Sequence, residues 1–291
     1  MLKFISFLKK LYGFFLAIPF KIYALFNIPF KYFLLSGNYI KIYPKGQIAQ
    51  GLFQGWFEKN ETVLFQKFLK PGMTVIDAGA NVGFYSLIAA KVVGINGKVY
   101  AFEPSKETFQ RLNANIFINN DLNIVPVNFG LGDKVDQKLI LRQDIGHQDA
   151  ERYIFPLNVA PETKLDNIGQ LGNHEEILID TLDNFCLKNR LKSVDFMKID
   201  TEGFEYYILL GAKEILLNNP SLIILMECTE LGTSRASTSQ KQVFDYVKSV
   251  GLKVFYWNVE LNSFCDDEEG VYKAGDVWIC RSRLQLEESN N

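Results

Sequence analysis

Short apolar runs alternate with amphipathic segments from residue 71 to residue 281. The apolar runs are rich in β-branched or aromatic residues and end at polar or turn residues, which is typical of buried strands. They are Met73–Ala80, Lys98–Glu103, Leu122–Asn128, Val194–Asp200, Ser221–Glu227, Lys253–Asn258 and Asp276–Arg281. Segments with helical spacing follow most of them: Phe84–Val93, 106–119 with Ser105 as N-cap, Phe204–Leu217 and Gln240–Val250.

This alternation predicts a Rossmann-like α/β fold with a doubly wound, mostly parallel sheet. A loop separates the last two strands, so we expect them to form an antiparallel hairpin at the edge of the sheet. Residues 58–291 are expected to form this domain, after an N-terminal arm over residues 1–57. The stretch 138–180 is polar and long for a connection, which favours a substrate lid with Tyr153 and Phe155 as pocket walls.

The arm is basic and aromatic, whereas the rest of the chain is acidic. Up to Phe57 it has seven lysines and no carboxylate, and the remainder carries 24 basic and 33 acidic residues. Pro19, Lys21 and Lys31 interrupt its apolar runs, so we expect neither a secretory signal nor a membrane-spanning helix. Three alternatives remain open for residues 1–45: a cap packed on the domain, a subunit interface, or a peripheral membrane contact through aromatic rings and lysines.

Composition narrows the classes of function. The 291 residues are 48% hydrophobic and 22% charged, as in a folded globular protein, and the formal net charge of -2 gives no general attraction for nucleic acid. The four cysteines are widely spaced, and the two histidines are His147 and His174. A structural zinc site is therefore not expected, and the cysteines favour a reducing, cytoplasmic setting. The oligomeric state cannot be read from the sequence.

Acids and glycines follow the first two predicted strands. The first strand leads from Asp77 through Gly79 and Asn81 to Gly83, and Glu103 ends the second strand, 20 residues after Gly83. The turn is not the dinucleotide fingerprint, because Asn81 stands where that pattern has a glycine. S-adenosylmethionine (SAM) carries an ammonium and a sulfonium that suit the Asp77 carboxylate. Glu103 stands where a ribose-binding acid is expected.

Carboxylates also gather at the later strand ends. Asp200 and Glu202 follow the fourth core strand, and Glu227 ends the fifth. Because the carboxyl ends of parallel strands meet at one crevice, these three are the candidate catalytic residues. They would act as a general base on a hydroxyl group or, alternatively, hold a Mg²⁺ that acidifies it. No residue is assigned as a metal ligand.

The motifs together resemble the FkbM family of methyltransferases. The matching pieces are VIDAGANVGFYS (75–86), YAFEP (100–104), GLGD (130–133), TLD (181–183), VDFMKIDTEGFE (194–205), LLGA (209–212) and LIILME (222–227). The resemblance implies a class I methyltransferase fold, SAM as methyl donor and usually a hydroxyl oxygen as acceptor.

Within that class, the expected acceptors are a sugar or glycan, a lipid-linked glycan or a small secondary metabolite, and no nucleic acid. The alternative is a non-catalytic protein on the same fold that acts in membrane or protein assembly. The candidate SAM-binding residues lie in the turns after the first three strands: Asp77, Gly79, Ala80, Asn81, Gly83, Phe84, Tyr85, Glu103, Pro104, Gly130 and Leu131.

Overall fold

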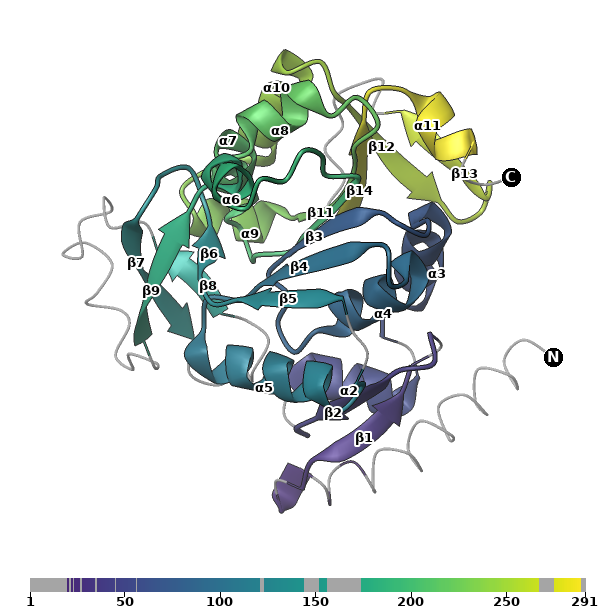
Figure 1. Cartoon of the computed structure of the whole chain (residues 1–291), viewed down its shortest axis with the longest axis vertical. Helices are drawn as coiled ribbons and strands as arrows, with labels where there is room; N and C mark the ends of the chain where they lie inside the picture. The colour runs from purple at the N-terminus through teal and green to yellow at the C-terminus, as the bar shows by residue number, and fades with distance from the viewer. Residues whose placement is uncertain are drawn as a thin grey trace.

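A mixed β-sheet with helices on both faces forms the body of the protein, and a smaller sheet adjoins it (Figure 1). The structure is a computed structural model, and it describes residues 20, 22, 24–26, 28–34, 36–44, 46–55, 57–120, 123–143, 152–155, 174–266 and 275–288. The predicted fold class is confirmed. Predictions for residues 1–19 of the arm, for 144–151 and 156–173 of the insertion, and for the Phe155 side chain fall outside the described residues.

The main sheet has eight strands in the order β13-β12-β14-β11-β10-β3-β4-β5. The five parallel strands are β11 (Ile223–Cys228), β10 (Phe196–Ile199), β3 (Thr74–Ala78), β4 (Lys98–Phe102) and β5 (Ile124–Val127). Consecutive residues of β10 are buried, so both faces of the sheet are covered. Helices connect these strands, which is how a parallel sheet obtains cover on both faces.

The C-terminal part of the sheet contains the predicted antiparallel pair of last strands, β12 and β14, and one additional strand, β13. The three antiparallel strands are β14 (Gly275–Cys280), β12 (Lys253–Asn258) and β13 (Ser263–Asp266). The hairpin is formed by β12 and β13, while β14 pairs with β11 on one side and β12 on the other. The sequence Ser-Phe-Cys-Asp of β13 is too short and too mixed to be identified as a strand by its pattern.

Helices α3 (Lys59–Phe68) and α4 (Phe84–Val93) pack on one face of the sheet. The opposite face is covered by α6 (Leu182–Lys188), α7 (Glu205–Leu210), α8 (Lys213–Asn218) and α10 (Gln240–Ser249). The helix predicted over Phe204–Leu217 is two helices, with the break at Gly211. A Cβ at Gly211 would lie 1.8 Å from the carbonyl oxygen of Gly132, so the chain is held at this close contact.

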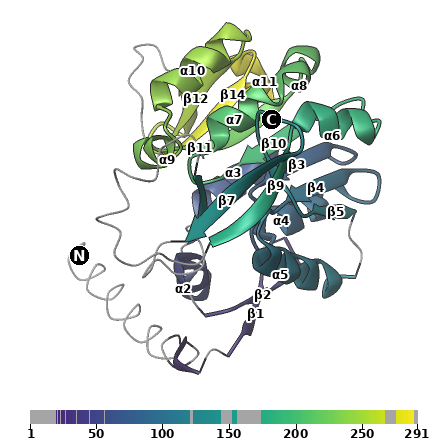
Figure 2. The same ribbon diagram turned by 90° about the vertical axis from the view of Figure 1, so that its left-hand side faces the viewer.

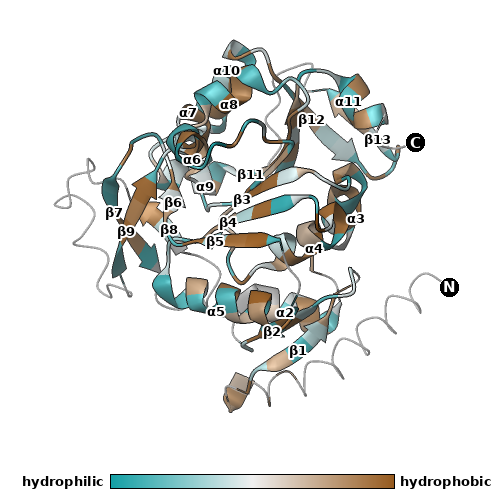
Figure 3. Ribbon diagram, viewed as in Figure 1, coloured by the Kyte–Doolittle hydropathy of each residue, from teal (hydrophilic) through white to brown (hydrophobic). Residues whose placement is uncertain are grey.

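Helix α5 (Lys106–Phe117) follows β4 as predicted, although the side chain of Ser105 does not cap it. In Figure 3 hydrophobic and hydrophilic residues alternate along α5, as expected for a helix with one buried side. Two short helices complete the described elements of the C-terminal half, α9 (Glu230–Arg235) and α11 (Arg283–Glu288).

A second sheet lies beyond one end of the parallel strands, as Figures 1 and 2 show together. Its strand order is β6-β9-β7-β8, with β6 (Gly130–Leu131), β9 (His174–Asp180), β7 (Gln137–Gln143) and β8 (Arg152–Phe155). The described parts of the stretch 138–180 thus form strands, and whether the stretch acts as a substrate lid stays a prediction.

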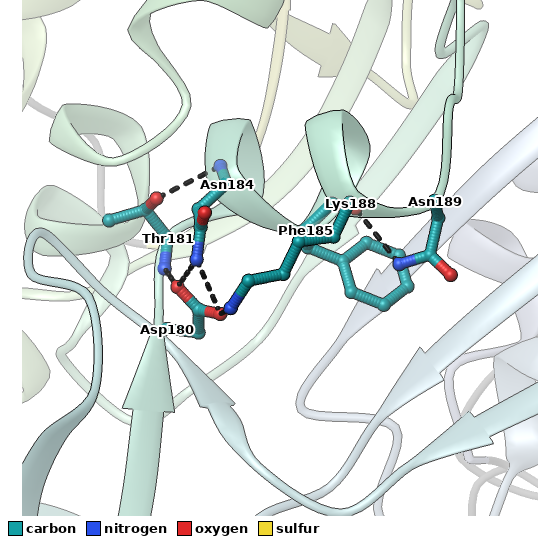
Figure 4. Close-up of polar contacts among 6 residues, drawn as sticks. All are labelled: Asp180, Thr181, Asn184, Phe185, Lys188 and Asn189. Carbon is teal, nitrogen blue, oxygen red and sulfur yellow. Dashed lines mark hydrogen bonds and ion pairs between the residues drawn. The ribbon is translucent and has the colours of Figure 1, made fainter.

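Asp180 fixes the junction between this second sheet and α6 (Figure 4). Its Oδ1 accepts hydrogen bonds from the Thr181 backbone N–H at 2.7 Å and from the Asn184 side chain at 2.7 Å, and its Oδ2 pairs with Lys188 at 3.2 Å. The Thr181 hydroxyl then caps α6 by accepting from the Asn184 N–H at 3.1 Å. The Thr-Leu-Asp motif is therefore a helix N-cap.

The described part of the N-terminal arm packs on the body of the protein. It contains the antiparallel strands β1 (Phe30–Phe33) and β2 (Tyr39–Ile42) and the helix α2 (Gly46–Gln54), whose apolar residues join the core with α3 and α4. Asn38 donates to the carbonyl oxygen of Leu87 in α4 at 2.5 Å. No helix among the described residues is long and apolar enough to cross a membrane.

Asn115 of α5 joins the hairpin to the turn after β3. Its side chain accepts from the Lys41 N–H at 2.7 Å and donates to the carbonyl oxygens of Lys41 and Val82, at 3.3 and 2.8 Å. The residue is 1% exposed. We therefore expect Asn115→Ala to lower the free energy of unfolding by about 2–3 kcal/mol in urea denaturation, because buried backbone groups lose their partners.

The matched control is Asn113→Ala, two residues away on the same helix, whose side chain donates to the carbonyl oxygen of Phe109 within its own helix. We expect this variant to lose less than about 1 kcal/mol. Equal losses in the two variants would contradict a joining role for Asn115.

Candidate active site

A cavity of about 280 Å³ opens where the parallel strands end. This volume is near the lower end of the range typical of ligand pockets, about 300–1,000 Å³. The predicted site residues that line it are Asp77, Gly79, Ala80, Asn81, Phe84, Tyr85, Glu103, Pro104, Gly130, Leu131, Asp200, Glu202 and Glu227. It is also lined by residues that the sequence analysis did not select: Phe57, Glu58, Phe102, Thr108, Leu141, Ile154, Lys198 and Thr201.

Among the predicted SAM-binding and catalytic residues, all of which lie in the described part of the chain, Gly83 alone does not line the cavity. A Cβ at this position would lie 2.7 Å from Cδ1 of Leu112, so Gly83 brings α4 and α5 together. Gly79 does line the cavity, at a φ of +83°, but a Cβ there would lie 1.9 Å from the carbonyl oxygen of Asp200. Both glycines thus allow close packing of the chain on itself.

Asp77, at the end of β3, is 3% exposed and accepts a hydrogen bond from the Ser86 hydroxyl at 2.5 Å. Burial raises the pKa of Asp77 to about 6, against the lowering effect of Ser86 and of Lys198. A buried carboxylate in this position favours a cationic ligand, since a positive charge would offset the cost of its desolvation.

Glu103, at the end of β4, holds the turn after β3 in place. Its Oε2 accepts from the Asn81 N–H at 3.0 Å, and its Oε1 accepts from the Ser105 N–H at 2.9 Å. Asn81 has a φ of +49°, a left-handed conformation that asparagine tolerates better than most residues. Each carboxylate oxygen can accept more than one hydrogen bond, so the chemistry of Glu103 suits ligand hydroxyl groups as well as backbone N–H groups.

Lys198 of β10 is 1% exposed, and its ammonium lies among carboxylates from several elements. Its Nζ lies 3.3 Å from Oδ2 of Asp200 and 3.4 Å from Oδ1 of Asp276, and it faces the Tyr85 ring at 5.0 Å. Burial alone would lower the pKa of Lys198, but the charges of Asp200 and Asp276 outweigh burial and raise it well above its usual value. The ammonium therefore remains charged and holds the acidic strand ends together.

Glu227 of β11 stands opposite Asp276 of β14 in the sheet register. Burial and the negative charges of Asp200 and Glu202 raise the pKa of Glu227 to about 9. At neutral pH its carboxyl group is thus protonated, so it can donate a hydrogen bond but cannot accept a proton. This separates Glu227 from the other two predicted catalytic residues.

Glu202 joins the cavity to the second sheet through Arg235. The Arg235 guanidinium lies 3.5 Å from Oε2 of Glu202 and 5.0 Å from the centre of the Tyr153 ring of β8. Tyr153 is not among the described residues that line the cavity, whereas Leu141 and Ile154 of the same sheet are. The insertion therefore contributes Leu141 and Ile154 to the cavity and not the expected Tyr153, while the expected Phe155 side chain lies outside the described residues.

Glu205, the last acid of the motif VDFMKIDTEGFE, stabilises the turn that carries Glu202. Its Oε1 accepts from the Thr201 N–H at 3.1 Å, the Gly203 N–H at 3.0 Å and the Thr201 hydroxyl at 3.0 Å. Glu202 itself has a φ of +56°. Glu205 is 2% exposed and does not line the cavity, so its role is structural.

Glu58 is the main residue that the sequence analysis missed. It precedes α3 in a left-handed conformation, with φ 41° and ψ 39°, and accepts a hydrogen bond from the Tyr85 hydroxyl. Burial raises the pKa of Glu58 to about 7, although Lys198 lowers it. The only signal in the sequence is that Glu58 is the first carboxylate after a long basic segment.

Among the described residues, no three His, Cys, Asp or Glu side chains are grouped so that they could hold a metal ion. The charged groups of the cavity do fit SAM. Asp77 offers a buried carboxylate to its cationic groups, and Glu103 offers hydrogen-bond acceptors to its ribose. The excess of carboxylates over the one buried ammonium favours a ligand with a positively charged sulfonium.

The strand order, the turn after β3 and the acids at the ends of β3 and β4 define a class I SAM-dependent methyltransferase. The family model described as the methyltransferase FkbM domain matches residues 77–254, more than half of the chain. The protein therefore belongs to the FkbM methyltransferase family, and SAM is its methyl donor.

Several solved methyltransferase structures are similar to this chain. A SAM-dependent methyltransferase from Aquifex aeolicus is 17% identical, with a TM-score of 0.41, over 76% of this chain and 87% of that one. A fibrillarin from Aeropyrum pernix in complex with SAM is 11% identical, with a TM-score of 0.41, over 76% and 74%. A putative rRNA methylase from Clostridium thermocellum is 13% identical, with a TM-score of 0.40, over 76% and 91%.

The raised pKa of Glu227 makes the stability depend on pH. The pKa of Glu227 is 4.5 in an unfolded chain and about 9 in the folded protein. Between these two pH values the folded protein keeps a proton that the unfolded chain releases. The contribution of Glu227 to stability is thus greatest below pH 4.5 and falls as the pH rises toward 9. From pH 5 to pH 8 we expect the wild type to lose up to about 1.4 kcal/mol per pH unit relative to Glu227→Gln, measured by urea unfolding.

Glu260→Gln, at an exposed position, is the matched control and should follow the wild type at every pH. If the free energy of unfolding changes with pH in the same way in the wild type and in Glu227→Gln, Glu227 ionises normally in the folded protein.

Proposed function

We propose that this protein transfers the methyl group of SAM to a hydroxyl oxygen of a sugar, glycan, lipid-linked glycan or secondary metabolite. The observation that carries the proposal is the convergence of Asp200, Glu202 and Glu227 on the cavity that also holds Asp77 and Glu103. A hydroxyl group is a weak nucleophile at neutral pH and gains from a carboxylate that accepts its proton as the new bond forms.

Bound SAM supplies an electrophilic methyl carbon, and the residues of the chain align the acceptor oxygen with it. Asp200 accepts the hydroxyl proton. Glu227, which keeps its own proton at neutral pH, donates a hydrogen bond to a second oxygen of the acceptor and so orients it. Alignment of the two reactants supplies much of the acceleration in such a displacement.

The carboxylates of the cavity favour a small, uncharged acceptor with hydroxyl groups and disfavour a nucleic acid. Phosphate groups near Asp200, Glu202 and Glu58 would meet several carboxylates, and the formal net charge of the chain is -2. Nucleic-acid binding depends instead on lysine and arginine contacts to phosphates.

Asp77→Asn tests the donor half of the site. We expect calorimetric titration to show SAM binding weakened about tenfold or more, because a hydrogen bond to a charged group contributes about 1.5–3 kcal/mol. The control is Asp195→Asn, whose carboxylate accepts from the Thr74 N–H at the far end of β3. It should bind SAM as the wild type does, and unchanged binding by Asp77→Asn would remove Asp77 from the donor site.

Asp200→Asn tests the acceptor half. Assays of S-adenosylhomocysteine formation with a panel of glycans and alcohols should show kcat lowered about 10²- to 10⁴-fold, with SAM affinity nearly unchanged. Asp276→Asn removes the other carboxylate that pairs with Lys198, and Asp276 is not among the described residues of this cavity. If both variants lose kcat equally, the effect comes from the charge on Lys198 and not from proton transfer.

A further inference from the structure

The hairpin of β1 and β2 has one buried face and one exposed face. Ile40 and Ile42 lie in the core that this hairpin shares with α2, α3 and α4. Because side chains alternate between the two faces of a strand, Phe33 and Tyr39 point the other way, and they are 58% and 49% exposed. These two residues are partners in the strand register, and their ring centroids are 5.1 Å apart. The exposed face thus presents a pair of aromatic rings to solvent.

Two lysines stand beside this aromatic pair. Lys31 and Lys41 lie on the same face and are also partners in the strand register, two residues along from Phe33 and Tyr39. Like charges directly opposite each other destabilise a sheet. The chain has no carboxylate before Glu58, so the hairpin itself holds no acid that could offset the two lysines. An anionic partner would remove this repulsion.

The segment that leads into β1 adds exposed apolar side chains. Leu25 and Phe26 are 78% and 66% exposed, and Ile22 and Ile28 are exposed as well. Figures 1 and 2 show β1 at the outer edge of the molecule, on the side of β2 away from the main sheet. Large apolar side chains that gather at one exposed place mark an interaction surface. We call this surface the arm face and define it by six residues: Leu25, Phe26, Lys31, Phe33, Tyr39 and Lys41.

We propose that the arm face binds the surface of a membrane that contains anionic phospholipids. The lysine ammonium groups pair with lipid phosphates, and the rings of Phe33 and Tyr39 lie at the depth of the headgroups, where aromatic residues are enriched. Leu25 and Phe26 reach the boundary of the acyl chains. None of the six arm-face residues lines the active-site cavity, so the proposal is independent of the methyl acceptor.

Charge complementarity favours lipid over another part of this chain or a second copy of it. A symmetric dimer through the arm face would place Lys31 and Lys41 of both copies in one interface. Residues 1–19 of the chain contain three lysines and no acid, so they would add to the positive charge. Headgroups such as that of phosphatidylglycerol supply the negative charge that both alternatives lack, and apolar chains lie directly beneath them.

Co-sedimentation of the full-length protein with lipid vesicles tests the lysines. We expect vesicles of phosphatidylglycerol and phosphatidylcholine in equal parts to be bound at least about tenfold more tightly than vesicles of phosphatidylcholine alone. Lys31→Gln/Lys41→Gln should weaken binding to the anionic vesicles about tenfold or more, since each lysine near such a surface contributes about fivefold. The matched control is Lys192→Gln/Lys213→Gln, which removes two exposed lysines after α6 and at the start of α8 and should bind as the wild type does.

A second pair of variants tests the apolar part of the arm face. Leu25→Ser/Phe26→Ser should also weaken binding to the anionic vesicles about tenfold or more, because these side chains no longer gain from burial in lipid. Leu187→Ser/Leu284→Ser replaces two exposed leucines of α6 and α11 and should leave binding unchanged.

The proposal would be overturned if the wild type did not bind the anionic vesicles, or if either arm-face variant bound them as the wild type does. A wild-type dimer that Leu25→Ser/Phe26→Ser dissociates in sedimentation velocity would also overturn it, because the arm face would then join two copies. SAM titration reports whether each variant is folded, and we expect lost vesicle binding with unchanged SAM affinity. Failure of methyl transfer to every hydroxyl acceptor would overturn the proposed function alone and leave the vesicle result as it stands.

Discussion

The buried ammonium of Lys198 is the interaction on which the acidic end of the sheet depends. An isolated charge in this position would cost several kcal/mol in desolvation, so Lys198 is tolerated only with Asp200 and Asp276 beside it. The dependence runs in both directions, since the acids at the ends of β3, β10, β11 and β14 would repel one another without a cation. The pairing of β14 with β11 brings Asp276 to within 3.4 Å of Lys198.

One ammonium does not neutralise all the surrounding carboxylates, and protons make up part of the difference. Burial raises the pKa of Asp77 to about 6, of Glu58 to about 7 and of Glu227 to about 9, so each group keeps its proton to a higher pH than an exposed carboxyl group does. A cation that enters the cavity lowers these pKa values and releases protons. Donor binding and protonation of the site are thus linked through the same carboxylates.

The sequence predicted the parallel strands and the strand-end residues that line the cavity well, because both are encoded locally. Asp77 and Glu103 lie at strand ends that the hydrophobic pattern marks, within short motifs. Residues that reach the cavity through tertiary packing were missed. Glu58 precedes a helix far from any motif, and Leu141 belongs to a sheet whose strands are separated by long connections. Lys198 did leave a signal, since a lysine within the apolar strand Phe-Met-Lys-Ile requires buried partners.

The Phe57–Glu58 segment limits how far the N-terminal side of this domain can be shortened. The family motifs begin after Glu58, at the strand that leads to Asp77, yet Glu58 bonds to Tyr85 inside the motif-bearing region. A fragment trimmed to the motifs would retain the donor turn but would open Tyr85 and Lys198 to water. Water would screen the positive charge of the Lys198 ammonium from the neighbouring carboxylates. The Phe57–Glu58 segment therefore forms part of the wall of the cavity, although no motif identifies it.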